Sequence, residues 1–199
     1  MVAGKRSSFR GLVGFAVDSP SSGQFSIDIT GIDFRAGDIG MLVWTSGVTD
    51  STPGVSPAMT ELLNNGNSFA YSMTMVGNET AITSTTMSHD GVRPIFAIFR
   101  GFAKPTAVSA NIAGTSPANP GAVTAAVNDL VLVTSHYVVG VTDTAPSGYT
   151  LVSSGSATNG STGLAYKKAL SAGSEDPGAW GVTSGAATYR ALTILLEVV

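Results

Sequence analysis

The sequence predicts an all-β protein, a single antiparallel β-sandwich of jelly-roll-like order, and three observations lead to this prediction. Apolar residues alternate with polar or small ones in several segments, and Gly, Asn and Pro fill the breaks between them. Gly (24) and Pro (9) are spread along all 199 residues, which leaves little room for a helix of three turns. We therefore expect about a dozen short strands joined by tight turns.

Period-two alternation is clearest in three segments, Phe25 to Ile29, Phe69 to Met75 and Leu192 to Val198. Each predicts a strand with one buried face. Two other segments, Ile95 to Phe99 and Leu130 to Val133, are apolar on both faces. We expect them at the centres of sheets, because a central strand is covered on both sides.

The turns between these strands have recognisable chemistry. Asn65-Gly66 and Asn159-Gly160 suit two-residue hairpins, and Pro146-Ser147-Gly148 suits a tight turn. The longest window without Gly or Pro, 122–139, is rich in Val and Thr. It predicts one long strand.

An internal pseudo-repeat organises the chain into two halves, at about 37–101 and 122–199. Similar elements recur in the same order, and insertions separate the copies. The matching pairs are Gly37 to Val43 with Asn128 to Val133, Pro57 to Leu62 with Pro146 to Leu151, Phe69 to Tyr71 with Leu164 to Tyr166, and Arg93 to Ile98 with Tyr189 to Ile194. The link 101–121 resembles a boundary in composition, although 107–112 could form a strand. Each half alone would have a small core and exposed edges, so we expect one domain, 1–199.

The composition excludes several classes of protein. The chain has no Cys, so it has no disulfide, thiolate nucleophile or Cys-based metal site. A net charge of −3 and only 12% charged residues argue against a nucleic-acid partner. The apolar run from Gly11 to Val17 is too marginal for a signal peptide, and no run has the length of a membrane helix. We expect synthesis in the cytoplasm and no membrane insertion.

Catalytic chemistry has few candidates, and we predict no catalytic, cofactor-binding or metal-ligating residue. His89 and His136 are the only histidines, and no nucleophile elbow or phosphate-binding loop occurs. Asp38 and Asp129 stand at matching strand starts, which indicates repeated turn capping. Whether a loop binds calcium stays open, because Asp50-Ser51-Thr52 and Glu175-Asp176 could each supply one or two oxygens.

Aromatic residues offer a second class of function, a carbohydrate-binding module that stacks sugars on exposed rings. Trp44, Tyr149 and Trp180 are the candidate glycan contacts, with Tyr137 and Tyr189 as further rings. Trp44 ends an apolar run and Trp180 follows Pro177-Gly178-Ala179 into a strand, so core or rim packing explains both tryptophans. A third class, a hydrolase with an inconspicuous pair of carboxylates, is also open, since no pair of acids stands out.

The motif order of residues 37–199 resembles the β-sandwich structural proteins of tailed-bacteriophage virions, found in tail fibres, baseplates and on capsid surfaces. In that type an Asp-led apolar strand, a Pro-x-Gly-aromatic-Thr turn and a Tyr-Lys-x-Ala strand precede a final apolar strand. The matching segments here are Asn128 to Leu132, Ala145 to Leu151, Gly163 to Lys167 and Ala191 to Leu196, with Phe96 to Gly101 echoing an Arg-Gly strand ending in the first half. Tyr149 stands where the type more often has Trp, and the first half lacks a clear copy of the turn.

The resemblance implies a non-enzymatic virion protein on the tail or capsid that holds its neighbours together or contacts the host. It implies other virion proteins as partners and a homo-oligomer, for which a trimer is the expected size. A host-surface glycan is a further candidate partner. The protein would be made in the host cytoplasm and end in the virion. The resemblance carries over no catalytic residue, cofactor or metal.

Overall fold

The computed structural model describes residues 9–18, 20, 24–46, 54–84, 92–111, 117–158, 160–182 and 189–199. All regular structure within these ranges is β-strand, so the predicted all-β, sandwich-like class is confirmed. The strands are β1 (Gly11–Val17), β2 (Ser26–Asp28), β3 (Ile39–Thr45), β4 (Val55–Ser56), β5 (Thr60–Asn64), β6 (Ser68–Thr74), β7 (Ala81–Ser84), β8 (Ile95–Arg100), β9 (Phe102–Asn111), β10 (Val123–Ala125), β11 (Leu130–Tyr137), β12 (Asp143–Thr144), β13 (Thr150–Ala157), β14 (Gly160–Lys168), β15 (Gly173–Glu175), β16 (Gly181–Val182) and β17 (Tyr189–Val198).

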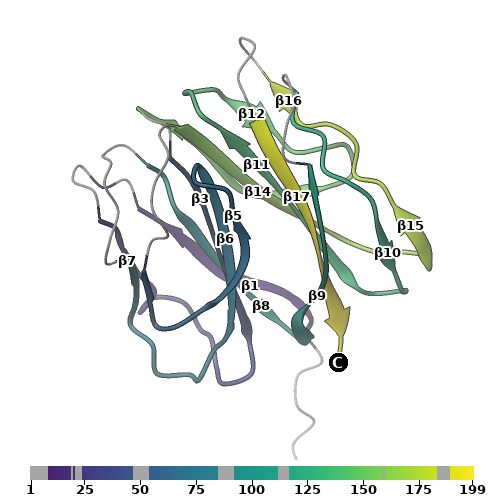
Figure 1. Ribbon diagram of the computed structural model, residues 1–199. Coiled ribbons are helices and arrows are strands. Elements are labelled where there is room, and N and C mark those ends of the chain that lie inside the picture. Colours follow the sequence, from purple (N-terminus) through teal and green to yellow (C-terminus); the bar gives the residue numbers. More distant parts are fainter. Residues whose placement is uncertain are drawn as a thin grey trace, which may run out of the picture.

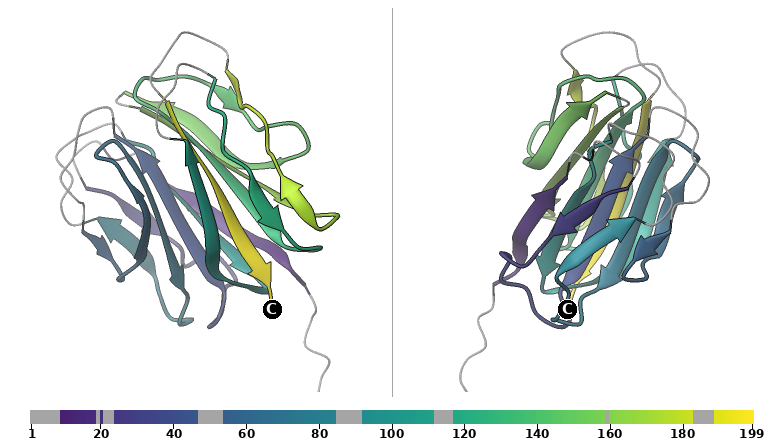
Figure 2. Two further views of the ribbon diagram at one scale, coloured as in Figure 1. Left: turned by 45° about the vertical axis from the view of Figure 1, so that its right-hand side comes forward. Right: turned by 90° about the vertical axis from the view of Figure 1, so that its left-hand side faces the viewer.

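Two five-stranded antiparallel sheets lie face to face, as Figure 1 shows. The first has the order β1-β8-β3-β6-β5 and the second the order β13-β14-β11-β17-β9. Smaller sheets lie on their outer sides, β2-β7-β4 beside the first and β10-β15 and β12-β16 beside the second (Figure 2). The chain therefore builds four layers, with the two large sheets in the middle.

The two large sheets repeat one strand order. If β1, β8, β3, β6 and β5 are matched with β9, β17, β11, β14 and β13, the first sheet becomes the second. In the first half the pairing is nested, since β1 pairs with β8, β2 with β7 and β3 with β6. Nested pairing is compatible with a jelly-roll-like winding. The pseudo-repeat seen in the sequence is thus a repeat of strand order.

The halves begin earlier in the chain than the sequence suggested. The expected link 101–121 contains β9 (Phe102–Asn111), which is the edge strand of the second sheet. The first half likewise includes β1 and β2, before residue 37. Pro105 lies in β9 where the register with β17 shifts. Pro cannot donate a hydrogen bond to a neighbouring strand, so it is tolerated in an edge strand. Because Pro is typical of linkers, the sequence indicated a link at this position and not a strand.

The expected single strand over 122–139 is two strands, β10 and β11, separated by 126–129. Asn128 has a φ of 75°, a left-handed conformation that Asn adopts more readily than most residues. Asp129 accepts a hydrogen bond from the backbone N–H of Ala126 at 2.8 Å, which closes the turn. Side-chain capping therefore ended the strand where neither Gly nor Pro marked a break.

The same cap recurs in the first half, which confirms the expected role of Asp38 and Asp129. Asp38 accepts from the backbone N–H of Arg35 at 3.0 Å, three residues before it. Asp38 also forms an ion pair with Arg100 at 2.8 Å. Asp129 instead accepts from the backbone N–H of Val198 at 3.0 Å. Each half thus uses its aspartate to tie the start of a central strand to the end of the neighbouring strand.

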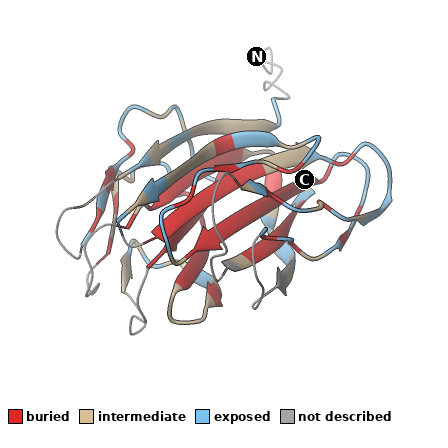
Figure 3. Cartoon of the chain, turned by 90° about the horizontal axis from the view of Figure 1, so that it is seen from above, coloured by how far each residue is buried: buried red, intermediate tan, exposed pale blue. Residues whose placement is uncertain are grey.

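The core is divided among the layers, and Figure 3 shows the buried strands at the centre of the molecule. Between the large sheets lies a cluster drawn from both halves, including Met41, Val43, Leu132, Leu164 and Ile194. A second cluster of buried side chains fills the space between the first large sheet and β2-β7-β4. Two smaller ones lie on the outer face of the second sheet. Because the central cluster needs both sheets, the two halves share their main hydrophobic core.

The turns follow the predicted chemistry in part, because three residues, 65–67, lie between β5 and β6 where two were expected, and Gly160 is the first residue of β14. Gly66 has a φ of 83°, and the Asn65 side chain accepts from the backbone N–H of Ser68 at 3.0 Å. Gly148 has a φ of 81°, and the N–H of Tyr149 donates to the carbonyl of Pro146 at 3.0 Å. Asn159 lies outside the described residues.

Candidate functional site

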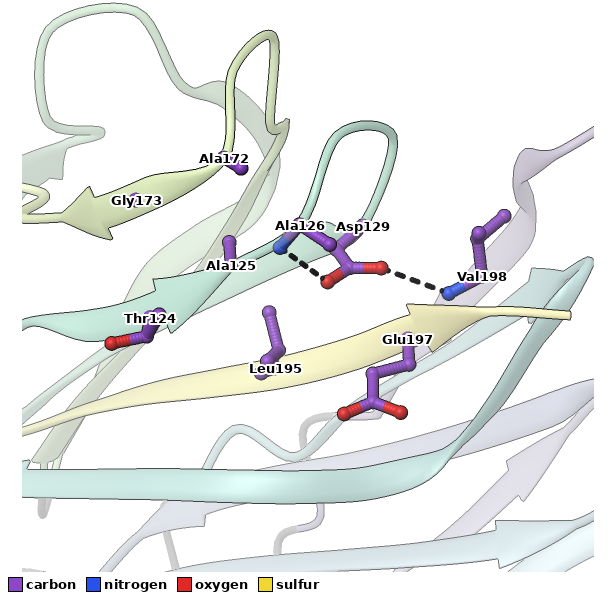
Figure 4. Close-up of a pocket in the computed structure, with 9 residues that line it drawn as sticks. All are labelled: Thr124, Ala125, Ala126, Asp129, Ala172, Gly173, Leu195, Glu197 and Val198. Carbon is purple, nitrogen blue, oxygen red and sulfur yellow. Dashed lines mark hydrogen bonds between the residues drawn. The ribbon is translucent and has the colours of Figure 1, made fainter.

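A hollow on the outer side of the second large sheet is the candidate binding site (Figure 4). It lies between the small sheet β10-β15 and the end of β17, and its volume is about 460 Å³, within the range of small-ligand pockets. Small and apolar side chains form most of its wall. The lining residues are Thr124, Ala125, Ala126, Asp129, Ala172, Gly173, Leu195, Glu197 and Val198.

Two carboxylates line this hollow, and they differ in exposure. Asp129 is 3% exposed, and its two oxygens accept from the backbone N–H groups of Ala126 and Val198, drawn as dashed lines in Figure 4. Glu197 is exposed and has no ion-pair partner among the described residues. Asp129 therefore serves as a structural cap, whereas Glu197 can meet a ligand.

The hollow offers two carboxylates and a mostly apolar wall. Of the two carboxylates, Asp129 is buried and already accepts two backbone hydrogen bonds, whereas Glu197 is exposed. The remaining polar side chain is Thr124, and the described wall contains no His or Lys. The carboxylate of Glu197 offers a negatively charged hydrogen-bond acceptor beside an apolar surface.

A buried polar cluster lies between the two large sheets. The imidazole Nδ1 of His136 lies 2.9 Å from the hydroxyl of Thr45, and its Nε2 lies 2.9 Å from the hydroxyl of Thr134. Thr162 donates to Thr45 at 3.1 Å. The cluster thus joins β3 of the first sheet to β11 and β14 of the second, and it matches the expectation that His136 has a structural role.

Burial keeps His136 neutral in the folded protein. Loss of solvent is the largest of the effects that lower its pKa from 6.5 to about 3, and the positive charge of Arg190 contributes to the same fall. Arg190 is the cross-strand neighbour of His136 in β17. A protonated imidazole would also lose its acceptor nitrogen. His136 therefore works as a hydrogen-bonding bridge and is closed to solvent, at 1% exposure.

A second buried acid, Asp143, lies on the outer face of the second sheet. The Ser135 hydroxyl donates to its carboxylate, while Oδ1 has no hydrogen-bond partner among the described residues. Burial is the largest effect on the pKa of Asp143 and raises it above its usual value. The residue is 2% exposed, so it faces no accessible space.

The aromatic candidates for glycan stacking are engaged within the protein. Trp44 is 0% and Trp180 1% exposed, and Trp44 stacks on Phe69 at 4.7 Å between ring centroids. Their rings therefore offer no face to a sugar, because core packing covers both sides. Tyr149 is half-buried, with Lys167 above its ring at 5.6 Å and its hydroxyl donating to Glu175 at 3.3 Å. The three rings do not form a platform.

The remaining sequence candidates are dispersed. Tyr137 is buried, and its hydroxyl accepts from the N–H of Ala118 at 3.0 Å. Glu175 forms an ion pair with Lys167 at 2.5 Å, and Asp176 accepts from the N–H of Gly178 at 3.3 Å. His89, the segment 50–52 and the side chain of Tyr189 lie outside the description. Among the described residues, no three His, Asp or Glu side chains come together as metal ligands.

No sequence pattern predicted the hollow, because it is associated with a short connection and not with a motif of residues. One signal was present: the first half has ten residues, 29–38, between β2 and β3, while the second has four, 126–129, between β10 and β11. Comparing those lengths around the two capping aspartates would have located it.

No helix in the described ranges has the length and hydropathy to cross a membrane. Compared with protein-family models, with curated proteins and with solved structures, the chain has no match in any of the three.

Proposed function

We propose that this protein is a non-catalytic structural component of a tailed-phage virion, on the tail or the capsid surface, where it associates with copies of itself and with other virion chains. The observation that carries the proposal is the use of the buried polar groups. Asp38, Asp129 and His136 serve backbone caps and a bridge between the sheets. A protein whose buried polar groups stabilise its own fold is suited to a structural role.

The doubled strand order gives a second line of support. Two similar sheets share one core, and β1, β5, β9 and β13 are their edge strands. Charged residues make up only 12% of the chain, and a surface of small side chains loses little conformational entropy when it is covered. Such surfaces suit extensive contacts within a particle.

Glycan recognition by the three candidate rings finds no support in their positions, since two are core residues.

The test is to look for the chain in purified particles of the phage whose genome encodes it. Mass spectrometry of the particles should detect the protein at a fixed copy number, and a specific antibody should label one position in electron micrographs. Native mass spectrometry of the purified chain should give a homo-oligomer, with a trimer expected. A monomeric chain that is missing from purified particles would disprove the proposal.

A further inference from the structure

The hollow lies at a position that the first half of the chain fills. Both halves lead from a small outer sheet to a central strand through a connection that ends at the capping aspartate. In the first half this connection is 29–38, and in the second it is only 126–129. The longer connection carries Ile32 and Phe34, which pack against the outer core of the first sheet.

The strand register identifies the empty place. Ile98 pairs with Gly40 in the first sheet, and Leu195 pairs with Val131 in the second. Gly14 in β1 is the other strand partner of Ile98. Ile32 lies close to it, because a Cβ added to Gly14 would be 2.8 Å from the Cγ2 atom of Ile32. Leu195 is the counterpart of Ile98, and it lines the hollow. The hollow is therefore the counterpart of the space that the connection carrying Ile32 and Phe34 occupies.

The charge at this place is reversed between the halves. Arg100 and Glu197 stand at corresponding positions. Arg100 comes one residue after the strand partner of Ile39, the first residue of β3. Glu197 comes one residue after the strand partner of Leu130, the first residue of β11. Arg100 holds the longer connection, because its Nη2 donates to the carbonyl of Asp33 at 2.8 Å. Glu197 can only accept hydrogen bonds when ionised. A segment in the hollow must therefore supply donors, and a positive charge would suit it best.

We propose that this hollow is a docking site for a short segment of a neighbouring protein chain, with two bulky apolar side chains spaced as in Ile32 and Phe34 and a Lys or Arg facing Glu197. The neighbour rests on the proposed function, since it would be another chain of the particle. The apolar side chains would cover Ala126, Ala172 and Val198, which are exposed or half-buried above the buried Leu195, and the basic side chain would meet Glu197 at the rim. Such an isolated segment binds weakly, and an assembly strengthens it through high effective concentration.

The probe is a synthetic peptide with the sequence of residues 30–37 carrying Asp33→Lys, acetylated and amidated at its ends. Titrated into the full chain, it should give saturable NMR shifts of the Leu195 and Val198 methyl groups, with a Kd on the order of 1 mM or below for so small a contact. A matched peptide with Ala in place of Ile32 and Phe34 should give no saturable shift. Absence of saturable shifts with the first peptide would overturn the proposal.

Variants of the protein separate the charge from the shape of the site. Glu197→Lys should weaken binding at least about tenfold and Glu197→Gln by less, because the charge reversal also repels the peptide. Ala126→Phe should fill the hollow and abolish the shifts. The matched control is Ala36→Phe, an exposed alanine in the corresponding turn of the first half, which should bind as the unmodified chain does. Unchanged binding by both Glu197→Lys and Ala126→Phe would contradict the assignment.

A chimera provides a readout that does not depend on peptide affinity. Replacing residues 126–129 by the sequence of 29–38 should give a folded chain with an equal or higher Tm that no longer binds the peptide. If the peptide binds only after residues 1–8 are deleted, the site belongs to the chain's own terminus and the partner is wrong. These measurements use the isolated chain, so a chain that binds the peptide but is missing from particles would disprove only the proposed function.

Discussion

The hydroxyl of Thr45 and the imidazole Nδ1 of His136 lie 2.9 Å apart at counterpart positions of the two halves. Thr45 stands at the end of β3 and His136 near the end of β11, and each comes seven positions after the capping aspartate of its half. Their contact joins the two large sheets where the apolar cluster between them gives way to polar side chains. This polar cluster thus ties one half to the other.

The first prediction is that stability falls in acid because of His136. Its pKa is about 3 in the fold and 6.5 in the unfolded chain, so between these values the unfolded state binds the extra proton. The contribution is complete above pH 6.5 and is lost towards pH 3, by at most about 1.4 kcal/mol per pH unit. Denaturant unfolding at several pH values measures it. His136→Gln should flatten the slope, and an unchanged slope would contradict the assignment.

The second prediction has the opposite sign. Burial raises the pKa of Asp143, so the folded state binds the extra proton at pH values above the ordinary pKa of 3.8. Ionised Asp143 destabilises the fold at neutral pH, and this cost disappears as the pH falls below its folded pKa. Asp143→Asn should therefore raise the Tm at pH 7, by about 2–4 °C for each kcal/mol gained, and bring a smaller gain in acid. A lower Tm at pH 7 would contradict it.

The third prediction concerns the cap at Asp129. Asp129→Ala leaves the N–H groups of Ala126 and Val198 without their acceptor, which should lower the free energy of unfolding by about 1–3 kcal/mol. Asp33→Ala, at an exposed position in the first half, should change it by less than about 0.5 kcal/mol. Urea denaturation of the two variants at pH 7 checks the difference. Equal effects would show that the cap is unimportant.

The fourth prediction concerns the tight packing of Gly40 in β3. A Cβ at this position would be 2.5 Å from the ring of Phe96, which is fully buried. Gly40→Ala should cost about 1–3 kcal/mol of unfolding free energy by overpacking. Combining it with Phe96→Leu should be less destabilising than the sum of the single changes, a coupling that a double-mutant cycle measures. Simple additivity would exclude the clash.

The amino-acid sequence by itself determined the all-β class, several of the strands and the repeated order of elements. Alternation of apolar residues identified Phe69 to Met75 and Leu192 to Val198 as strands, but the expectation of a single buried face was wrong for both. Both faces of β6 and of most of β17 are buried, because these strands lie inside large sheets that other layers cover on each side. The caps at Asp38 and Asp129 were also visible, because capping is local. Local chemistry of this kind depends on neighbours in the chain.

Only the tertiary structure decided what these elements meet. Trp44 and Trp180 could have been exposed or buried by sequence alone, and packing between layers buried both. Asp129 and Glu197 lie far apart in the chain, and the pairing of β11 with β17 brings them to one hollow. The hollow lies beside the shorter of the two corresponding connections, 126–129. Its shape is a property of space left unfilled between elements, which no local pattern of residues encodes.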